Sequence, residues 1–558
     1  SEYYGNKAEN LHERERDIKA ARGKLLDANG TVLATNKSVC TISVIHNQME
    51  EPEKVIAMLV KELGISEETA RKRVEKVSSI ERVKTNVAKE TGDAIRAYGL
   101  SGVKVDEDYK RYYPYGTLAS KVLGFTGADN QGILGLEVKY DEYLQGTNGK
   151  ILTLTDARGI EIENAGESRL EPMNGYDLCL SLDYNIQMYC EQAAKKVCTK
   201  KSADSVSVIV MNPQNGELMA MVNYPEFDLN DPFTLVGDNG EAVSAEEKQN
   251  LLNKMWRNQC ISDTYEPGST FKLATMLTLL DDARMPVSMV YDTHNGDPVT
   301  VGPARNIRDS HRGDREIDFR RAVASSSNVY FAKAIWDRYG STGRKQEYSD
   351  FLHKELHLGQ TVGLERLGER KPSVTTDWKV PDPGVMLVKM SYGYRVRLAP
   401  IQMITFYNAI ANGGKMISPV LVRELRRGDR VEERFESRTI ASSIASRAAL
   451  REVQQCLQAV CTEGTASAFF RDTTRLRVAA KTGTAQITDA RSREGRYYLG
   501  SMVAYFPADA PRYTVLTTIE TRAQAGKAYY GGPLAGPVVK RMVDYIFNRG
   551  RDWYGRVD

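Results

Sequence analysis

A serine and a lysine three residues apart near the middle of the chain, Ser269 and Lys272, form a pair suited to nucleophilic chemistry. Pro267 and Gly268, which fit poorly inside a helix, stand just before an apolar run of helical length, Thr270 to Leu280. This pattern predicts a sharp turn into a buried helix, with both residues of the pair on one helical face. A buried lysine tends toward its neutral form, which can take the proton of a serine hydroxyl. By itself, however, the pair fits a capping serine better, because serine is a preferred N-cap residue.

Two further polar motifs change that balance. Ser326-Ser327-Asn328 begins 57 positions after Ser269, and Lys481-Thr482-Gly483-Thr484 begins 153 positions after Asn328. These distances leave room for a helical region and then a return to a sheet. The order Ser-x-x-Lys, Ser-x-Asn, Lys-Thr-Gly is shared by penicillin-binding proteins and serine β-lactamases. The sequence therefore resembles a class B penicillin-binding protein, a peptidoglycan D,D-transpeptidase of the division or sporulation (spore-cortex) type.

Length and composition set the frame for these motifs. The chain has 558 residues, which suits two or three domains, and its 41% hydrophobic and 27% charged residues are typical of globular proteins. The formal net charge of +3 is too close to neutral to indicate a nucleic-acid-binding protein. The seven cysteines follow no CxxC or other regular spacing, so we expect mostly buried thiols that form no disulfide.

The beginning of the chain bears on where the protein acts. The first stretch, SEYYGNKAENLHERERD, is polar, and no segment has the roughly 18 apolar residues needed to span a bilayer. The chain also starts without a methionine or a signal peptide. We therefore expect an ectodomain at the extracytoplasmic face of a bacterial cell membrane, with its N-terminal anchor absent from this chain.

Residues 1–170 are predicted to form an elongated α+β module without catalytic motifs, which we call the pedestal. The stretch from Ala21 to Asn36 predicts two strands around an Asn-Gly turn, and residues 51–100 have a charged, helical pattern. The segments RYYPYGTLASKVLGFTG and GILGLEVKYDEYLQGTNG resemble pedestal segments of division-type and sporulation-type class B proteins. The resemblance implies a dimerisation-type domain that serves as a spacer and offers a surface to a partner, such as a membrane glycosyltransferase.

Residues 171–558 are predicted to form the catalytic domain, which makes the fold class α/β and multidomain. A strand leads into a helix within 175–197, and two apolar strands flank a turn at Asn215-Gly216. The stretch from Leu398 to Gly414 predicts an amphipathic helix, and the last segments predict one more strand and a terminal helix. The resemblance implies a penicillin-binding transpeptidase fold, an antiparallel sheet with a helical subdomain.

The resemblance also assigns catalytic roles to individual residues. Ser269 would attack the carbonyl between the two terminal D-alanines of a stem peptide, and Lys272 would act as its base. Ser326 would relay a proton toward the leaving nitrogen, while the amide of Asn328 would hold the substrate backbone. An amine of a neighbouring stem peptide would then take the acyl group. Without the flanking motifs, Asn328 would be an ordinary turn or helix residue.

By the same resemblance, the third motif binds the substrate. Lys481 would attract the terminal carboxylate and help to depress the pKa of the catalytic lysine. Gly483 would let a substrate approach the strand edge closely, and Thr482 and Thr484 would offer hydroxyl groups. The N–H groups of Thr484 and Ser269 would form an oxyanion hole. No Glu-x-x-x-Asn element of class A β-lactamases is evident, so we expect slow deacylation by water.

One region departs from the family pattern. His294, Asp297 and His311 lie between the first two motifs, and Cys260 precedes the nucleophile. Two imidazoles, a carboxylate and a thiolate are a suitable ligand set for a structural zinc ion, with Asp292 as the substitute carboxylate. The chemistry itself requires no cofactor. The alternative interpretation is that these are polar loop residues and a buried thiol.

The leading hypothesis is a transpeptidase that β-lactams inhibit by acylation. The alternatives are a D,D-carboxypeptidase or β-lactamase of the same fold, in which water is the acceptor, and a β-lactam sensor or structural subunit of a wall-building complex. The long pedestal argues against a β-lactamase, and the lack of a signalling membrane module argues against a sensor. Tyr394 and Arg395, in the stretch SYGYRVRLAP, stand at the expected approach to the active site, where they could alter antibiotic access.

Overall fold

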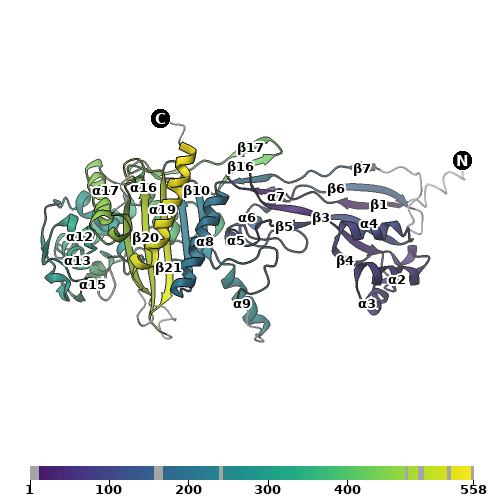
Figure 1. The fold of residues 1–558 in the computed structure, drawn as a ribbon, viewed down its shortest axis with the longest axis horizontal. Helices are drawn as coiled ribbons and strands as arrows, with labels where there is room; N and C mark the ends of the chain where they lie inside the picture. Colours follow the sequence, from purple (N-terminus) through teal and green to yellow (C-terminus); the bar gives the residue numbers. More distant parts are fainter. Residues whose placement is uncertain are drawn as a thin grey trace.

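The computed structural model describes residues 12–155, 168–237, 243–471, 476–487, 495–523 and 529–554. The molecule is elongated, with a large body of strands and helices at one end and a small head at the other (Figure 1). The pedestal and the C-terminal domain follow one another along this axis.

The pedestal is built on one long strand, β3 (Val32–Val44), whose 13 residues span roughly 43 Å at about 3.3 Å per residue. Its antiparallel partners are β2 (Leu25–Leu26), β4 (Glu81–Ala88) and β5 (Val103–Tyr112). The predicted Asn-Gly turn joins β2 to β3, as expected. The prediction of an uninterrupted helical pattern over 51–100 is wrong at β4, because pairing with β3 overrides the local pattern.

The head closes a small apolar core over the far end of β3. Its helices are α2 (Pro52–Leu63), α3 (Glu67–Val74) and α4 (Lys89–Ala97). A second pedestal sheet consists of β1 (His12–Ile18), β6 (Gly149–Thr155) and β7 (Ser168–Leu170). Three short helices lie nearer the body, α5 (Ser120–Leu123), α6 (Gly135–Lys139) and α7 (Asp141–Leu144).

A shared sheet joins the two parts of the molecule. β8 (Asp177–Leu180) pairs parallel with β2 of the pedestal and antiparallel with β16 (Val422–Arg427) of the C-terminal domain. β17 (Arg430–Arg434) extends this sheet beyond β16. The pedestal is therefore continuous with the body through backbone hydrogen bonds.

A five-stranded antiparallel sheet forms the centre of the C-terminal domain. Its strands, in spatial order, are β10 (Leu218–Tyr224), β9 (Ser205–Met211), β21 (Tyr513–Arg522), β20 (Tyr497–Phe506) and β19 (Ala479–Ile487). The strands predicted around Asn215-Gly216 are β9 and β10, and the predicted late strand is β21. Among the described strands, β19 is the edge of this sheet, and none of them pairs with the other side of its backbone.

Helices cover both faces of this sheet. α8 (Tyr184–Lys201) and α19 (Gly531–Tyr554) pack against each other over one face, and α16 (Pro400–Ala411) packs on the other. All twelve residues of α16 are buried, so the prediction of an amphipathic helix is wrong. This helix lies between the sheet and other helices, and it therefore needs no polar face.

A helical subdomain lies on the side of this sheet that is away from the pedestal (Figure 1). It contains α12 (Phe319–Ser325), α13 (Asn328–Ile335), α14 (Lys345–Lys354), α15 (Pro383–Met390) and α17 (Arg447–Thr462). α11 (Lys272–Leu277), all of whose residues are buried, contacts both α13 and α17. The predicted buried helix after Ser269 is thus present at the junction of sheet and subdomain.

Shorter elements complete the body. They are α9 (Ala245–Met255), α10 (Gln259–Ser262), α18 (Ser467–Phe470), β11 (Tyr291–Asp292), β12 (Val299–Val301), β13 (Ala304–Ile307), β14 (Glu316–Ile317), β15 (Met416–Ile417) and β18 (Thr439–Ala441). Within the ranges given above, no helix combines the length and the apolar character that crossing a membrane requires. The seven cysteines form no disulfide, and six of them are buried, as predicted.

Candidate active site

Ser269 lies in a tight turn that leads into a buried helix, as the sequence predicts. The turn is a 3-10 helix, η2 (Gly268–Phe271), and α11 continues it from Lys272. Gly268 has a φ of +56°, and a Cβ there would lie 2.7 Å from the carbonyl oxygen of Thr484 on β19. The absence of a side chain at Gly268 therefore lets the turn that carries Ser269 pack directly against the strand that carries the third motif.

The side chain of Lys272 lies at the centre of a polar network that joins the three motifs. Its Nζ donates to the carbonyl oxygen of Ser326 at 2.6 Å and to Oδ1 of Asn328 at 2.7 Å, and it lies 3.2 Å from Ser326 Oγ. Lys481 Nζ donates to the same Ser326 Oγ at 2.8 Å. The hydroxyl of Ser326 thus stands between two lysines.

Burial governs the protonation of both lysines, whose side chains have no solvent exposure. Desolvation lowers the pKa of Lys272 well below the ordinary lysine value, and the charge of Lys481 lowers it further, while Asp309 acts in the opposite direction. Desolvation also lowers the pKa of Lys481 to about 7. The arrangement therefore favours a neutral Lys272 amine, the form that can accept a proton.

Asp309 holds the second motif in place, and the sequence analysis missed this role. Its carboxylate accepts hydrogen bonds from Ser327 Oγ at 2.8 Å and from the backbone N–H groups of Asn328 and Val329 at 2.6 and 2.9 Å. These contacts cap the N-terminus of α13 and hold Ser326, which has a φ of +60°, at the junction of α12 and α13. No local spacing rule connects Asp309 to this junction, because a loop and a helix separate them in the chain.

The third motif lies on β19, with one side of the strand facing the cleft. The backbone N–H of Gln486 donates to the hydroxyl of Tyr394 at 3.4 Å, on the side away from β20. N–H groups two residues apart in a strand point to the same side, so the N–H of Thr484 also faces this edge. A Cβ on Gly483 would lie 2.9 Å from Cγ2 of Thr270, which gives this glycine a packing role against the nucleophile turn.

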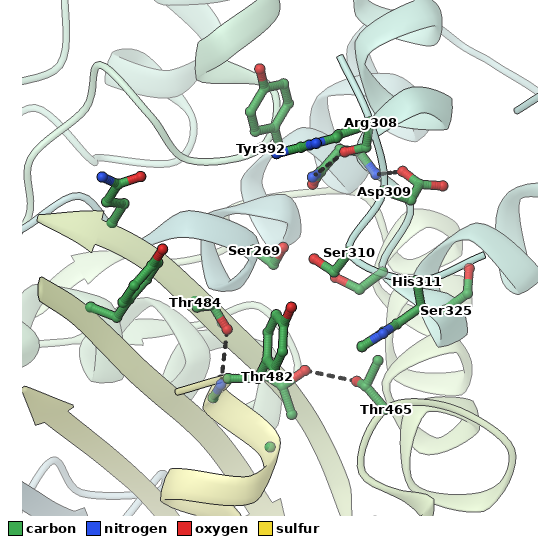
Figure 2. Close-up of a pocket in the computed structure, with 18 of the residues that line it drawn as sticks. Ser269, Arg308, Asp309, Ser310, His311, Ser325, Tyr392, Thr465, Thr482 and Thr484 are labelled. Atoms are coloured by element: carbon green, nitrogen blue, oxygen red, sulfur yellow. Dashed lines mark hydrogen bonds between the residues drawn. The ribbon is translucent and has the colours of Figure 1, made fainter. Parts of the chain in front are cut away.

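Residues of all three motifs line one cleft of about 880 Å³ (Figure 2). Ser269 lies near its centre, with Thr482 and Thr484 on the β19 side. Both threonine hydroxyls have protein partners: Thr482 Oγ1 contacts Thr465 Oγ1 at 2.7 Å, and Thr484 Oγ1 accepts the N–H of Gly531 at 2.8 Å. Tyr394, which the sequence placed at the approach, lines the cleft, and so do three tyrosines that no sequence pattern indicated, Tyr498, Tyr529 and Tyr530.

The zinc site predicted from the sequence is not assembled. Cys260 is completely buried, and its thiol donates to the carbonyl oxygen of Val222 on β10 at 3.3 Å. Burial raises the pKa of this thiol, which disfavours the thiolate that binds metals. Within the described ranges, no three His, Cys, Asp or Glu side chains gather closely enough to hold a metal ion.

The other predicted ligands lie apart from Cys260 in the loop between the first two motifs. His294 Nε2 lies 4.0 Å from Asp292 Oδ2, whereas Asp297 forms an exposed ion pair with Arg312 at 3.1 Å. His311 lines the cleft instead. These residues are polar loop residues, as the alternative interpretation held, because Cys260 is buried in α10 against β10 and the surface loop does not reach it.

Comparison with known proteins agrees with these motifs. A family model of the penicillin binding protein transpeptidase domain matches residues 206–544, and a model of the penicillin-binding protein dimerisation domain matches residues 17–180. Stage V sporulation protein D of Bacillus subtilis (strain 168) is 30% identical over 533 residues, which cover 94% of this chain and 77% of that protein. Peptidoglycan D,D-transpeptidase FtsI of Escherichia coli (strain K12) is 26% identical over 535 residues, which cover 94% of this chain and 83% of that protein.

The fold agrees as well. Penicillin Binding Protein 2X from Streptococcus thermophilus has a TM-score of 0.75 to this structure at 20% sequence identity, covering 96% of this chain and 80% of that one. This similarity confirms the predicted architecture, a pedestal followed by an antiparallel sheet with a helical subdomain. The two family models and the identity to the sporulation protein show that the chain belongs to the class B penicillin-binding proteins.

Proposed function

We propose that this protein cross-links peptidoglycan stem peptides as a serine D,D-transpeptidase, and that β-lactams acylate the same serine. The observation that carries the proposal is the hydrogen-bonded set of Lys272, Ser326, Asn328 and Lys481 beside Ser269. Relatives named as peptidoglycan D,D-transpeptidases, FtsI of Escherichia coli and the probable enzyme PenA of Neisseria meningitidis, support the substrate class.

In the proposed acylation step, Ser269 Oγ attacks the carbonyl carbon between the two terminal D-alanines. The neutral amine of Lys272 takes the hydroxyl proton as the new O–C bond forms. Ser326 passes a proton to the leaving nitrogen, the C–N bond breaks, and D-alanine departs. An ester on Ser269 remains, and the amide of Asn328 holds the substrate backbone.

The third motif would stabilise this step. The N–H groups of Thr484 and Ser269 are proposed to bind the developing oxyanion, and loss of one such donor typically costs about 10²–10³ in rate. Lys481 is proposed to attract the terminal carboxylate of the substrate. A bound carboxylate would also favour the protonated form of Lys481, because an opposite charge raises a lysine pKa.

The second half of the reaction transfers the acyl group to an amine of another stem peptide. The amine nitrogen attacks the ester carbon, the bond to Ser269 Oγ breaks, and the amine proton returns to the serine through Lys272. Among the described residues that line the cleft, Asp309 is the sole carboxylate, and both its oxygens accept hydrogen bonds. With no second carboxylate to activate water, we infer that hydrolysis is slow, which favours the transpeptidase over the carboxypeptidase and β-lactamase alternatives.

The remaining parts of the proposal concern context. We assign residues 1–170 to the pedestal and 171–558 to the transpeptidase domain. We further propose that the protein acts at the extracytoplasmic face of the membrane, in sporulation or cell division, and that its pedestal contacts a membrane glycosyltransferase. The sporulation protein among its relatives supports a role in sporulation.

Labelling with a fluorescent penicillin, followed by intact-protein mass spectrometry, tests the proposal. Ser269→Ala should abolish the covalent adduct without unfolding the protein, and Lys272→Ala should nearly do so, because an unactivated hydroxyl acylates slowly. Ser325→Ala, which changes a neighbouring cleft residue, is the control and should label normally. Undiminished labelling of Ser269→Ala would refute the assignment, and rapid loss of the adduct with hydrolysed drug accumulating would support a β-lactamase instead.

A further inference from the structure

Two basic residues from the helical-subdomain side, Arg308 after β13 and Lys389 of α15, line the cleft. Both residues line the cleft, and Figure 2 shows the Arg308 side chain beside Tyr392, across from Thr482 and Thr484. Arg308 is exposed and Lys389 is half-buried. They are distinct from Lys481 of the third motif, which is fully buried.

The packing of the helical subdomain places these two cations on the same wall. Ile307, the last residue of β13, packs in one apolar cluster with Val388 of α15 and with Tyr392. Arg308 directly follows Ile307, and Lys389 directly follows Val388. The hydrophobic contact therefore fixes the strand end and the helix end against each other, with a positive charge next to each.

Within the part of the chain that the structure describes, no acidic side chain neutralises these two cations. Among the described residues, neither Arg308 nor Lys389 forms an ion pair. Asp309 is the nearest carboxylate in sequence, but its two oxygens already accept hydrogen bonds from Ser327 and from the first turn of α13. Two like charges on one wall repel each other, and this cost is relieved when an anion binds between them.

We propose that Arg308 and Lys389 form a subsite for a side-chain carboxylate of the donor stem peptide. The inference rests on the proposed transpeptidase function, because it adds a second anionic contact to the one made by Lys481. A donor peptide that adds along the edge of β19 in extended form points its side chains alternately to the two faces of the sheet, and the side chains on one of these faces lie in the cleft that Arg308 and Lys389 line. Stem peptides contain acidic residues upstream of the two terminal D-alanines, and a guanidinium binds a carboxylate through two parallel hydrogen bonds.

The subsite distinguishes peptide donors from β-lactams. A simple penicillin has one carboxylate, which occupies the position of the terminal carboxylate, and it has no acidic side chain to reach Arg308 or Lys389. Removing either cation should therefore weaken the reaction with acidic peptides and leave penicillin acylation almost unchanged.

The test uses a soluble pentapeptide donor that ends in D-Ala-D-Ala, in its acidic form and in forms with each side-chain or branch carboxylate amidated in turn. The measured quantity is kcat/KM for D-alanine release, with a stem peptide that bears a free amine present as the acceptor, by the wild type, Arg308→Gln and Lys389→Gln. Arg305→Gln is the matched control, because Arg305 is an exposed arginine on β13, three positions before Arg308, and does not line the cleft. Penicillin acylation rates are measured on every variant.

We expect Arg308→Gln and Lys389→Gln each to lower kcat/KM about tenfold or more on the acidic donor, in line with a lost charged hydrogen bond. On one of the amidated donors both variants should equal the wild type, and that donor identifies the carboxylate. Equal losses on all donors, or no loss, would overturn the subsite. If Arg308→Gln no longer reacts with penicillin, its active site is disturbed. The test then rests on Arg308→Lys and Lys389→Gln. If the wild type releases no D-alanine, the proposed function fails, and the subsite is then judged by how well each donor protects against penicillin labelling.

Discussion

The hydroxyl of Ser326 lies between two buried amines, and burial lowers the pKa of both. Lys481 Nζ donates to Ser326 Oγ at 2.8 Å, and Lys272 Nζ lies 3.2 Å from the same oxygen. Two buried like charges at this separation are unfavourable, so the network holds at most one full charge comfortably. With Lys481 as the donor, the Ser326 proton can point toward a neutral Lys272, which gives the proton relay a defined direction.

The pH dependence of acylation tests this arrangement. The rate of penicillin acylation should rise as Lys272 loses its proton and should level off well below pH 10.5, because burial lowers the pKa of Lys272. In Lys481→Gln a neighbouring positive charge is removed, so the pKa of Lys272 rises and the ascending limb moves to higher pH. This shift of the ascending limb requires a protonated Lys481 in the wild type, so it should fade above about pH 7. Normalised rate profiles measure it, and a limb that stays in place or moves to lower pH would contradict the coupling.

Asp309 shows how one carboxylate can position a motif it does not belong to. Asp309→Ala leaves the N–H groups of Asn328 and Val329 without their partner and should lower the free energy of unfolding by about 1–3 kcal/mol. Because Asn328 and Ser326 would then shift relative to Lys272, acylation by penicillin should fall about tenfold or more. Denaturant unfolding and acylation rates, measured on the same preparation, test both effects.

The matched control for this variant is Asp318→Ala. Asp318 caps α12 by accepting the N–H of Arg321 at 2.9 Å, at the end of that helix remote from Ser326. We expect it to cost about 1 kcal/mol of stability and to leave acylation intact. If both variants acylate at the same rate, Asp309 is only a structural cap.

At the scale of elements, two glycines let the nucleophile turn meet the turn after α15. Gly268 N donates to the carbonyl oxygen of Gly393 at 3.1 Å. Gly393 has a φ of +87°, and a Cβ there would lie 1.9 Å from the carbonyl oxygen of Gly268. The contact is backbone against backbone, so it can be relieved only by moving the turn that carries Ser269.

Gly393→Ala should therefore reduce penicillin acylation by about tenfold or more, because small displacements of a nucleophile have large effects on rate. Gly413→Ala is the matched control, since Gly413 also has a positive φ of +65° but no atom lies within 4 Å of its Cβ position. Both substitutions should lower the free energy of unfolding by about 1–2 kcal/mol, because a residue with a Cβ is strained in the left-handed conformation. Acylation rates normalised to folded protein separate the two, and equal rates would show that the turn tolerates the clash.

At the scale of the whole molecule, three separate pedestal segments meet in one buried ion network. Glu137 Oε2 accepts from Arg22 Nε and Glu137 Oε1 from Arg111 Nε, both at 2.7 Å, and all three side chains are almost completely buried. Arg22 also pairs with Asp141 at 2.7 Å. All four residues belong to the pedestal, and Arg22 lies three positions before β2, so the network holds together the part of the pedestal that joins the shared sheet.

Glu137→Gln removes the charge that both arginines share and should destabilise the pedestal by about 3–5 kcal/mol, because it leaves buried cations uncompensated. Glu53→Gln, which breaks an exposed pair with Arg71 in the head, is the control and should leave the unfolding midpoint nearly unchanged. Thermal unfolding measures both. At temperatures where Glu137→Gln is still folded, its penicillin acylation should match the wild type, and a large loss there would mean that the pedestal also adjusts the active site.

The sequence by itself determined the chemistry and the order of the elements. Ser269 and Lys272 lie in consecutive helical turns, η2 and α11, as their local spacing predicts. The order of all three motifs was needed to interpret this pair as a nucleophile and its base. The Asn-Gly turns between β2 and β3 and between β9 and β10 were also visible, because turn geometry is set by neighbouring residues. The resemblance then predicted the two-part architecture that the family models confirm.

Only the tertiary structure decided which distant residues touch. Asp309 at the second motif and the tyrosines beside β19 come from segments that meet only after folding, so no local period reveals them. Contacts between distant segments also explain the two wrong predictions, the zinc site and the amphipathic helix. Cys260 is buried against β10 and cannot reach His311 in the cleft. All residues of α16 are buried. Periodicity reports whether one face of a segment meets solvent, but packing against other segments determines whether any solvent-facing side remains.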